Sequence, residues 1–173
     1  IQPRPDLLTA SRRRLPEARG VDQRYDAMVS AVDEAVGRVL DVFESRDRPR
    51  MIIFTSDHGG YGPLADNGPF RGSKGMLYEG GIRVPMIATW PSQIEAGSST
   101  SHISAFWDVF PTFAEISGQP IPENIDGLSF LPTLLGEDEQ PEHEYRYSAF
   151  HDTKGRQAGG NANWKGVSYK VTV

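Results

Sequence analysis

The 173-residue sequence contains no cysteine. Without thiols, these residues can form no disulfide bond and can supply neither a cysteine nucleophile nor a thiolate metal ligand. The sequence also lacks a run of the roughly 20 apolar residues that a membrane-spanning helix requires, so we expect no membrane span.

Positive charge is also scarce, because 18 Lys and Arg face 23 Asp and Glu and the formal net charge is −5. Binding to nucleic acid needs a clustered basic surface that neutralises phosphates. The short run Arg12–Arg14 is typical of a solvated turn instead. We therefore expect no nucleic-acid partner. The length and the hydrophobic content of 38% indicate a globular domain with a core.

The first half of the chain predicts an α/β arrangement. Residues 1–21 are rich in Pro and Arg, and we expect an irregular lead-in there. Apolar residues then recur at steps of three and four over 22–43, which predicts an amphipathic helix with Asp22 as its N-cap. The continuous apolar run 51–55 predicts a strand buried on both faces, and 84–90 predicts a second strand.

The rest of the chain predicts shorter elements. We expect a helix over 105–117 that ends at a glycine, a helical turn over 128–135, and two late strands over 145–150 and 164–173. These patterns divide the chain into the lead-in, an α/β domain over 22–136, and the start of a C-terminal subdomain over 137–173.

Two segments carry candidate chemistry. Asp57 and His58 follow the 51–55 strand, and polar groups at the carboxyl end of such a strand are where open α/β sheets bind ligands. Carboxylate and imidazole can both bind a divalent cation, although the pair could equally cap a turn and bond within a loop. Lys74 lies between glycines, where its ammonium could bind a tetrahedral oxyanion or simply be solvated. Glu79 and Arg83 lie four apart and could pair.

These segments resemble a known family. Ile53–Gly60, then Arg71–Gly75, then Tyr78–Pro85 resemble the second half of the type I sulfatases of the alkaline phosphatase superfamily, in sequence, order and spacing. Further stretches resemble later segments of that family: Trp107–Thr112, Asp126–Phe130, Gly155–Ala158 and Trp164–Val167. The resemblance implies the C-terminal part of an alkaline-phosphatase-like sandwich, a mixed sheet flanked by helices, plus a small C-terminal β-rich segment.

The resemblance also implies roles for the candidate residues. Asp57 and His58 would be metal ligands, and Lys74 would hold a sulfate oxygen. Calcium is the usual metal of the family, but His58 stands where most members carry Asn, which leaves Mg²⁺, Mn²⁺ or Zn²⁺ open. Glu79 and Arg83 would brace the loop. The implied partner is a sulfated small molecule or a sulfated carbohydrate, and the implied location is extracytoplasmic (periplasmic or secreted).

The sequence also lacks features of the family: the nucleophile motif, the first pair of Asp metal ligands and the histidine that helps the leaving group. The formylglycine nucleophile of the family is made from a Cys or Ser in a Cys/Ser-x-Pro-x-Arg motif, and no such motif occurs here. We expect that it lies upstream, in a missing N-terminal part of the same protein, and that this chain alone is inactive as a sulfatase. Two alternatives stay open: a phosphomonoester, phosphodiester or phosphonate hydrolase of the same superfamily, and a non-catalytic remnant that only binds.

Three histidines remain to be placed. His102 and His143 lie in polar segments that we expect to be exposed and without a catalytic role. His151 follows the 145–150 strand, and a loop in that place could contact the substrate.

Overall fold

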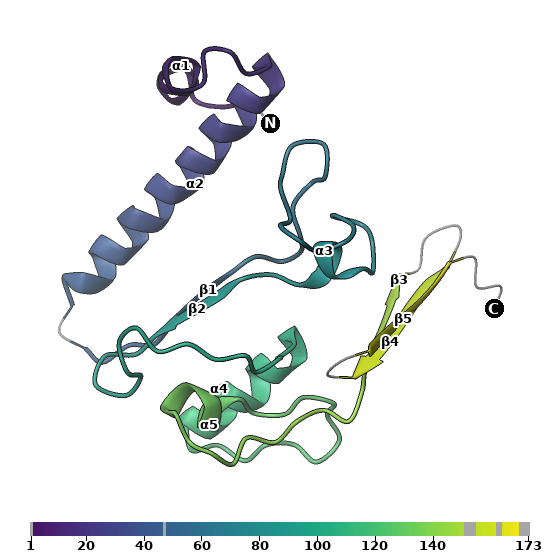
Figure 1. Ribbon diagram of the computed structural model, residues 1–173. Coiled ribbons are helices and arrows are strands. Elements are labelled where there is room, and N and C mark those ends of the chain that lie inside the picture. Colours follow the sequence, from purple (N-terminus) through teal and green to yellow (C-terminus); the bar gives the residue numbers. More distant parts are fainter. Residues whose placement is uncertain (1, 47, 151–154, 162–163, 170–173) are drawn as a thin grey trace. The chain divides into compact units, whose positions relative to one another are not determined.

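The computed structural model describes residues 2–46, 48–150, 155–161 and 164–169 (Figure 1). The chain divides into two compact units. Unit 1 consists of residues 1–48 with 60–66, and unit 2 consists of residues 49–59 with 67–173. Every candidate site residue falls in unit 2. Among the described residues, none of the helices combines the length and the apolar character needed to cross a bilayer.

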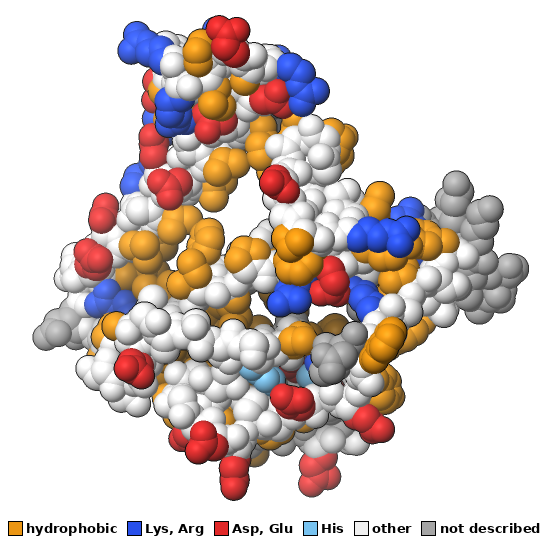
Figure 2. Space-filling model, viewed as in Figure 1, with side chains coloured by type: hydrophobic (Ala, Val, Ile, Leu, Met, Phe, Trp, Pro, Cys, Tyr) orange, Lys and Arg blue, Asp and Glu red, His pale blue; other side chains and the backbone are white. Residues whose placement is uncertain are grey.

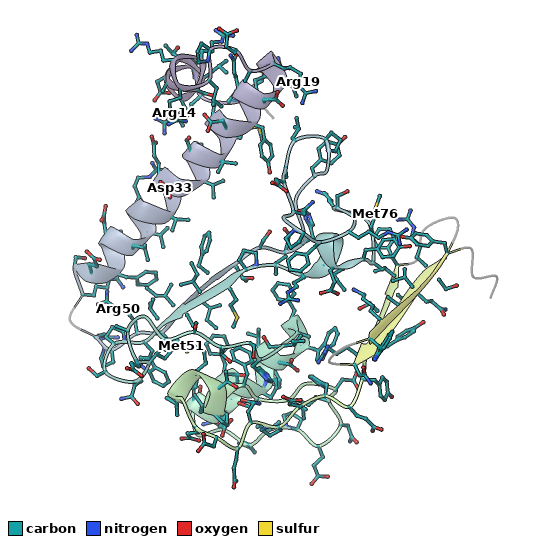
Figure 3. The ribbon with its side chains drawn as sticks, viewed as in Figure 1. Arg14, Arg19, Asp33, Arg50, Met51 and Met76 are labelled. Atoms are coloured by element: carbon teal, nitrogen blue, oxygen red, sulfur yellow. The ribbon has the colours of Figure 1, made fainter. Side chains whose placement is uncertain are left out.

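Unit 1 is a pair of helices, α1 (Pro5–Arg14) and α2 (Gly20–Glu44). The fully buried Ser11 hydroxyl donates to the Gln23 carbonyl oxygen at 2.8 Å and joins the two helices. Arg14, labelled in Figure 3, pairs with Asp26 at 2.6 Å. The predicted helix over 22–43 is confirmed. Several of its apolar side chains are exposed: Val29, Val32, Val39 and Val42. Figure 2 shows hydrophobic side chains, in orange, along this helix.

Two expectations for unit 1 are wrong. The lead-in over residues 1–21 is not irregular, because α1 forms within it. Proline is favoured in the first turn of a helix, and basic residues in the last turn suit the helix dipole, so the composition that suggested a loop is compatible with this helix. Asp22 is not the N-cap, since α2 begins at Gly20 after Arg19. Asp22 lies in the first turn and pairs with Arg19 at 2.8 Å.

The two predicted strands near the site are confirmed as β1 (Ile52–Thr55) and β2 (Met86–Thr89), which pair antiparallel. The expectation that β1 is buried on both faces is wrong for this chain, because the Phe54 side chain is 49% exposed. Within the described ranges, β1 has only β2 as a neighbouring strand, so its apolar residues lack cover. Between the strands, the single turn α3 (Glu79–Ile82) was not predicted.

The predicted helix over 105–117 forms as a 3₁₀ turn η1 (Phe106–Asp108) continued by α4 (Val109–Ile116). Pro111 lies in the first turn of α4, where a missing N–H costs no hydrogen bond. The short α5 (Leu131–Leu135) then ends at Gly136, whose φ is +74°. The core of this part is formed by Thr112, Phe130 and Asp108, which are all at most 1% exposed.

The C-terminal segment is a three-stranded antiparallel sheet in the order β3–β4–β5 (Figure 1). β3 (Arg146–Phe150) and β5 (Trp164–Tyr169) fall where strands were predicted. β4 (Arg156–Asn161) was not predicted, because its sequence RQAGGN has no alternation of apolar and polar residues. The register places Phe150, Arg156 and Tyr169 side by side across the three strands.

Candidate functional site

Asp57 and His58 lie directly after β1, and their side chains meet. The Asp57 Oδ2 atom lies 3.3 Å from the His58 Nε2 atom. The other ring nitrogen, Nδ1, lies 3.0 Å from the carbonyl oxygen of Gly59. The Asp57 side chain is 83% exposed and that of His58 is 38% exposed. The two side chains are thus on the same side of the chain, as expected for two ligands of one ion.

The tautomer of His58 follows from these contacts. A carbonyl oxygen can only accept, so Nδ1 carries the hydrogen and donates to Gly59. With the hydrogen on Nδ1, Nε2 carries the lone pair that can bind a metal ion, and it lies 3.3 Å from Oδ2 of Asp57. The Nδ1–H to carbonyl bond is also the usual way to orient a metal-binding histidine.

The donor set fits part of a divalent metal site. One carboxylate oxygen and one imidazole nitrogen suit Mg²⁺, Mn²⁺, Zn²⁺ or Ca²⁺ to different degrees, and 3.3 Å is compatible with two ligands of the same ion. No group of three potential ligands (His, Cys, Asp or Glu) occurs among the residues that the structure describes. Asp57 and His58 could therefore supply two ligands of a shell that needs more.

Close backbone packing fixes the segment that ends at Gly59 against α3. The Gly59 N–H donates to the Gly81 carbonyl oxygen at 2.9 Å. A Cβ atom at Gly59 would lie 1.9 Å from the carbonyl oxygen of Gly80, and one at Gly80 would lie 2.2 Å from that of Gly72. A Cβ atom at Gly81 would lie 2.0 Å from the Met76 carbonyl oxygen. The Glu-Gly-Gly stretch therefore lets three backbone segments approach one another more closely than any side chain would allow.

Lys74 occupies a tight turn on the same support. The Met76 N–H donates to the Ser73 carbonyl oxygen at 2.9 Å, and Gly75 has φ +84°. A positive φ at the third residue of a turn defines type II and favours glycine there. Lys74 is therefore the second residue of the turn. Its side chain is exposed, and the described part of the chain offers its ammonium no ionic or hydrogen-bonding partner.

The structure thus packs the backbone of the Lys74 turn and the backbone of Asp57–Gly59 against the same glycine pair, Gly80–Gly81.

Glu79, which begins α3, forms ion pairs with two basic side chains. Its carboxylate pairs with Lys165 at 2.8 Å and with Arg83 at 3.8 Å. The predicted pairing with Arg83 is present, while the shorter pairing with Lys165 could not be predicted from spacing. That the Lys74 ammonium faces Asp57 and His58 stays a prediction.

His143 is not exposed, contrary to expectation. Its side chain is 12% exposed and its Nε2 lies 2.7 Å from Oδ1 of Asp108, which is 1% exposed. The same carboxylate accepts from the Ala105 N–H at 2.6 Å and from the Leu128 N–H at 2.9 Å. Sequence reasoning missed this role of Asp108, because Leu128 and His143 are distant from it in sequence. The cluster joins η1 to two later segments and is structural.

The other histidines have different outcomes. His102 is half-buried rather than exposed. Burial lowers the pKa of its imidazole, against the opposing effects of Glu142 and Asp108. His151, the predicted substrate contact, lies outside the described residues.

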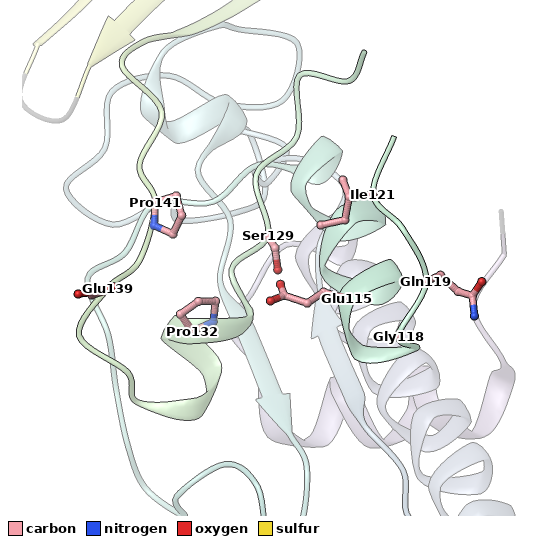
Figure 4. A pocket seen from close by; sticks show the side chains of 8 residues that line it. All are labelled: Glu115, Gly118, Gln119, Ile121, Ser129, Pro132, Glu139 and Pro141. Carbon is pink, nitrogen blue, oxygen red and sulfur yellow. The ribbon is translucent and has the colours of Figure 1, made fainter. Parts of the chain in front are cut away.

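A pocket lies elsewhere, between α4, α5 and the segments that follow them (Figure 4). It is lined by Glu115, Gly118, Gln119, Ile121, Ser129, Pro132, Glu139 and Pro141. The lining holds two carboxylates but no histidine and no cation. None of the candidate residues borders it, so we assign the chemistry to the segment around Asp57 and not to this pocket.

The two potential metal ligands after β1 and the exposed lysine of the glycine-rich turn would suit a hydrolase that binds a cation and an oxyanion together. Comparison with known protein families supports a hydrolase of this kind. The sulfatase family matches residues 5–119, and the C-terminal region of N-sulphoglucosamine sulphohydrolase matches residues 70–172. The chain belongs to the sulfatase family.

Individual relatives support the assignment. The chain is 35% identical to mouse (Mus musculus) steryl-sulfatase over 162 residues, which are 85% of this chain and 26% of that protein. It superimposes on Ps i-CgsB, solved in complex with k-i-k-neocarrahexaose, with a TM-score of 0.82 and 30% identity over 98% of this chain and 38% of that one. It also matches BT4656, solved with its substrate D-glucosamine-2-N,6-O-disulfate, with a TM-score of 0.70 and 29% identity over 84% of this chain and 31% of that one.

These structures confirm the predicted fold class, an alkaline-phosphatase-like α/β arrangement. The chain spans roughly a quarter to two fifths of the length of these relatives.

Proposed function

We propose that the protein containing this chain hydrolyses sulfate esters and that this chain supplies part of its metal and sulfate site. The observation that carries the proposal is the pairing of Asp57 and His58 at 3.3 Å, with Nδ1 committed to a carbonyl, in a chain of the sulfatase family. That arrangement offers two ligands to a divalent cation, and a bound divalent metal stabilises negative charge on the oxygens of a sulfate group.

The chain's own residues have distinct tasks in this proposal. Asp57 and His58 hold two positions of the metal shell, and the Gly59 carbonyl fixes the ring of His58. Lys74 contacts a sulfate oxygen and stabilises the charge that grows during cleavage, an effect that a preorganised donor supplies without reorganisation. Calcium is the metal we favour. The nucleophile, a formylglycine, would come from residues outside this sequence.

The substrate class is proposed from a relative. BT4656 is bound to a disulfated glucosamine, which supports a sulfated carbohydrate as the substrate here, with a sulfated small molecule as the other possibility. An extracytoplasmic location is also part of the proposal, because the family resemblance implies it. Fractionation of the native cells, followed by detection of the protein in each fraction, tests that location.

The complete protein provides the test of the activity. Sulfate release from a sulfated glucosamine and from an aryl sulfate would be measured beside phosphate release from the matching aryl phosphate. We expect sulfate release to exceed phosphate release, to stop after chelation and to return with Ca²⁺. A preference for the phosphate ester would support the phosphohydrolase alternative, and no turnover with intact metal binding would support the binding-only alternative.

A further inference from the structure

The C-terminal sheet contacts the Lys74 turn directly. The Arg156 guanidinium donates from Nη1 to the carbonyl oxygen of Gly75, 81 positions earlier in the chain. Gly75 is the residue that follows Lys74 and carries the positive φ of the turn. A hydrogen bond to this carbonyl therefore fixes the peptide plane next to the residue that we propose to contact sulfate.

Arg156 is itself held by the sheet. It begins β4, and the register places it between Phe150 and Tyr169. Its guanidinium lies 5.4 Å from the centre of the Phe150 ring and 5.7 Å from that of Tyr169. Both distances are within the range of cation–π attraction, and the planar guanidinium keeps its donors in fixed directions. The donor thus comes from a braced side chain rather than from a mobile one.

A second contact ties the same sheet to α3. Lys165 of β5 pairs with Glu79 at 2.8 Å, and the Lys165 side chain is only 21% exposed. The ring of Tyr169 lies 5.8 Å from that of Tyr78, the residue before α3. The sheet therefore contacts the support of the site at Glu79 and Tyr78 and the turn itself at Gly75.

We propose that Arg156 is a positioning residue for Lys74. The proposal rests on the proposed function of Lys74 and adds a role for the C-terminal sheet. The turn has glycines on both sides of Ser73 and Lys74 and one backbone hydrogen bond across it. The described part of the chain gives the ammonium of Lys74 itself no partner, so its position depends on the backbone that carries it. Arg156 contacts that backbone at Gly75.

A double-mutant cycle in the complete enzyme tests this role. The variants are Arg156→Gln, Lys74→Ala and the pair, with kcat/KM for an aryl sulfate as the readout. A misplacement of about 1 Å can cost roughly 100-fold, so we expect Arg156→Gln to lower kcat/KM by about 10- to 100-fold. In the Lys74→Ala background the same change should lower it less than about 2-fold, because the group that it positions is gone.

Two further variants separate positioning from folding. Arg156→Lys retains a positively charged donor on a long side chain, which Arg156→Gln does not, and should recover part of the activity. Arg146→Gln removes a half-buried arginine from the far end of the same sheet, opposite Gly160, and should leave kcat/KM within about 2-fold of the parent, since surface changes away from a site have small effects. Thermal unfolding of each variant, and the inhibition constant of inorganic sulfate, complete the set. We expect sulfate to bind more weakly to Arg156→Gln.

The outcomes distinguish the two proposals. Equal fold losses for Arg156→Gln with and without Lys74 would overturn the positioning role, as would normal kinetics in Arg156→Gln while Lys74→Ala is impaired. Normal kinetics in Lys74→Ala would overturn the proposed function of Lys74 itself. If Arg156→Gln does not fold, the cycle is measured with Arg156→Lys. The same fold loss of kcat/KM for Arg156→Lys with and without Lys74 would also overturn the proposal.

Discussion

The substitution Gly80→Ala tests the close packing that supports the site. A Cβ atom at Gly80 would lie 2.2 Å from the Gly72 carbonyl oxygen, 2.8 Å from its carbonyl carbon and 2.9 Å from the Arg71 carbonyl oxygen. Ordinary van der Waals contact begins near 3.4 Å. The two backbone segments must therefore separate by about 1 Å, and neither can yield by rotating a side chain.

That displacement falls between the two parts of the site. The Gly80 N–H donates to the Arg71 carbonyl oxygen at 2.8 Å, so the separation also strains this bond. Overpacking of this kind typically costs about 1–3 kcal/mol of stability. A shift of about 1 Å between catalytic groups can cost roughly 100-fold in rate. We expect Gly80→Ala in the complete enzyme to lower kcat/KM by about 100-fold while the protein remains folded at 25 °C.

The assay compares initial rates on an aryl sulfate with thermal unfolding of the same preparations. Gly159→Ala is the matched control, because a Cβ atom there would have no atom within 4 Å and Gly159 lies in the same unit. It should keep near-normal rates. If Gly80→Ala also keeps near-normal rates and stability, the close approach of these backbones does not support the site, and our explanation of the Glu-Gly-Gly stretch is wrong.

Three further predictions concern other parts of the chain. Asp108→Ala leaves two N–H groups and His143 without their acceptor. It should lower the free energy of unfolding by roughly 3–5 kcal/mol in a denaturant titration. A loss below about 1 kcal/mol would contradict the structural role of Asp108. Burial lowers the pKa of His102, so the unfolded chain binds its proton more readily than the folded chain. The free energy of unfolding should therefore fall as the pH drops below about 6.5, and His102→Gln should reduce the slope of that free energy against pH. An unchanged slope would contradict the lowered pKa of His102. Asp57→Asn removes a charged ligand and should weaken Ca²⁺ binding by the complete protein at least about 10-fold in calorimetry, and unchanged affinity would exclude Asp57 as a ligand.

Local signals in the sequence were enough to predict the elements that place the site. The apolar run before Ser56 gave β1, the three-and-four periodicity gave α2, and glycine marked the ends of α4 and α5. The type II turn at Gly75 is also consistent with its Gly-flanked sequence. In each case the residues that determine the structure are neighbours in the chain.

Contacts between distant residues could not be predicted in this way. The pairing of Glu79 with Lys165, the bond from Arg156 to Gly75, and the burial of His143 against Asp108 each join segments at least 35 positions apart. A single sequence does not determine which charged residue meets which partner across such separations. The misreading of residues 1–21 has another cause, since Pro and Arg occur both in loops and at the ends of helices.

The measurement that tests the proposed site most directly is the effect of Lys74→Ala on sulfate ester hydrolysis by the complete enzyme. Loss of one oxyanion-stabilising donor typically costs 10²–10³ in rate, so we expect kcat/KM to fall by roughly that factor. Lys74→Arg should recover only part of it, because a planar guanidinium does not replace a compact ammonium. Near-normal kinetics in both variants would mean that Lys74 is solvated and contacts no sulfate, and the proposed sulfate-binding role of this turn would be contradicted.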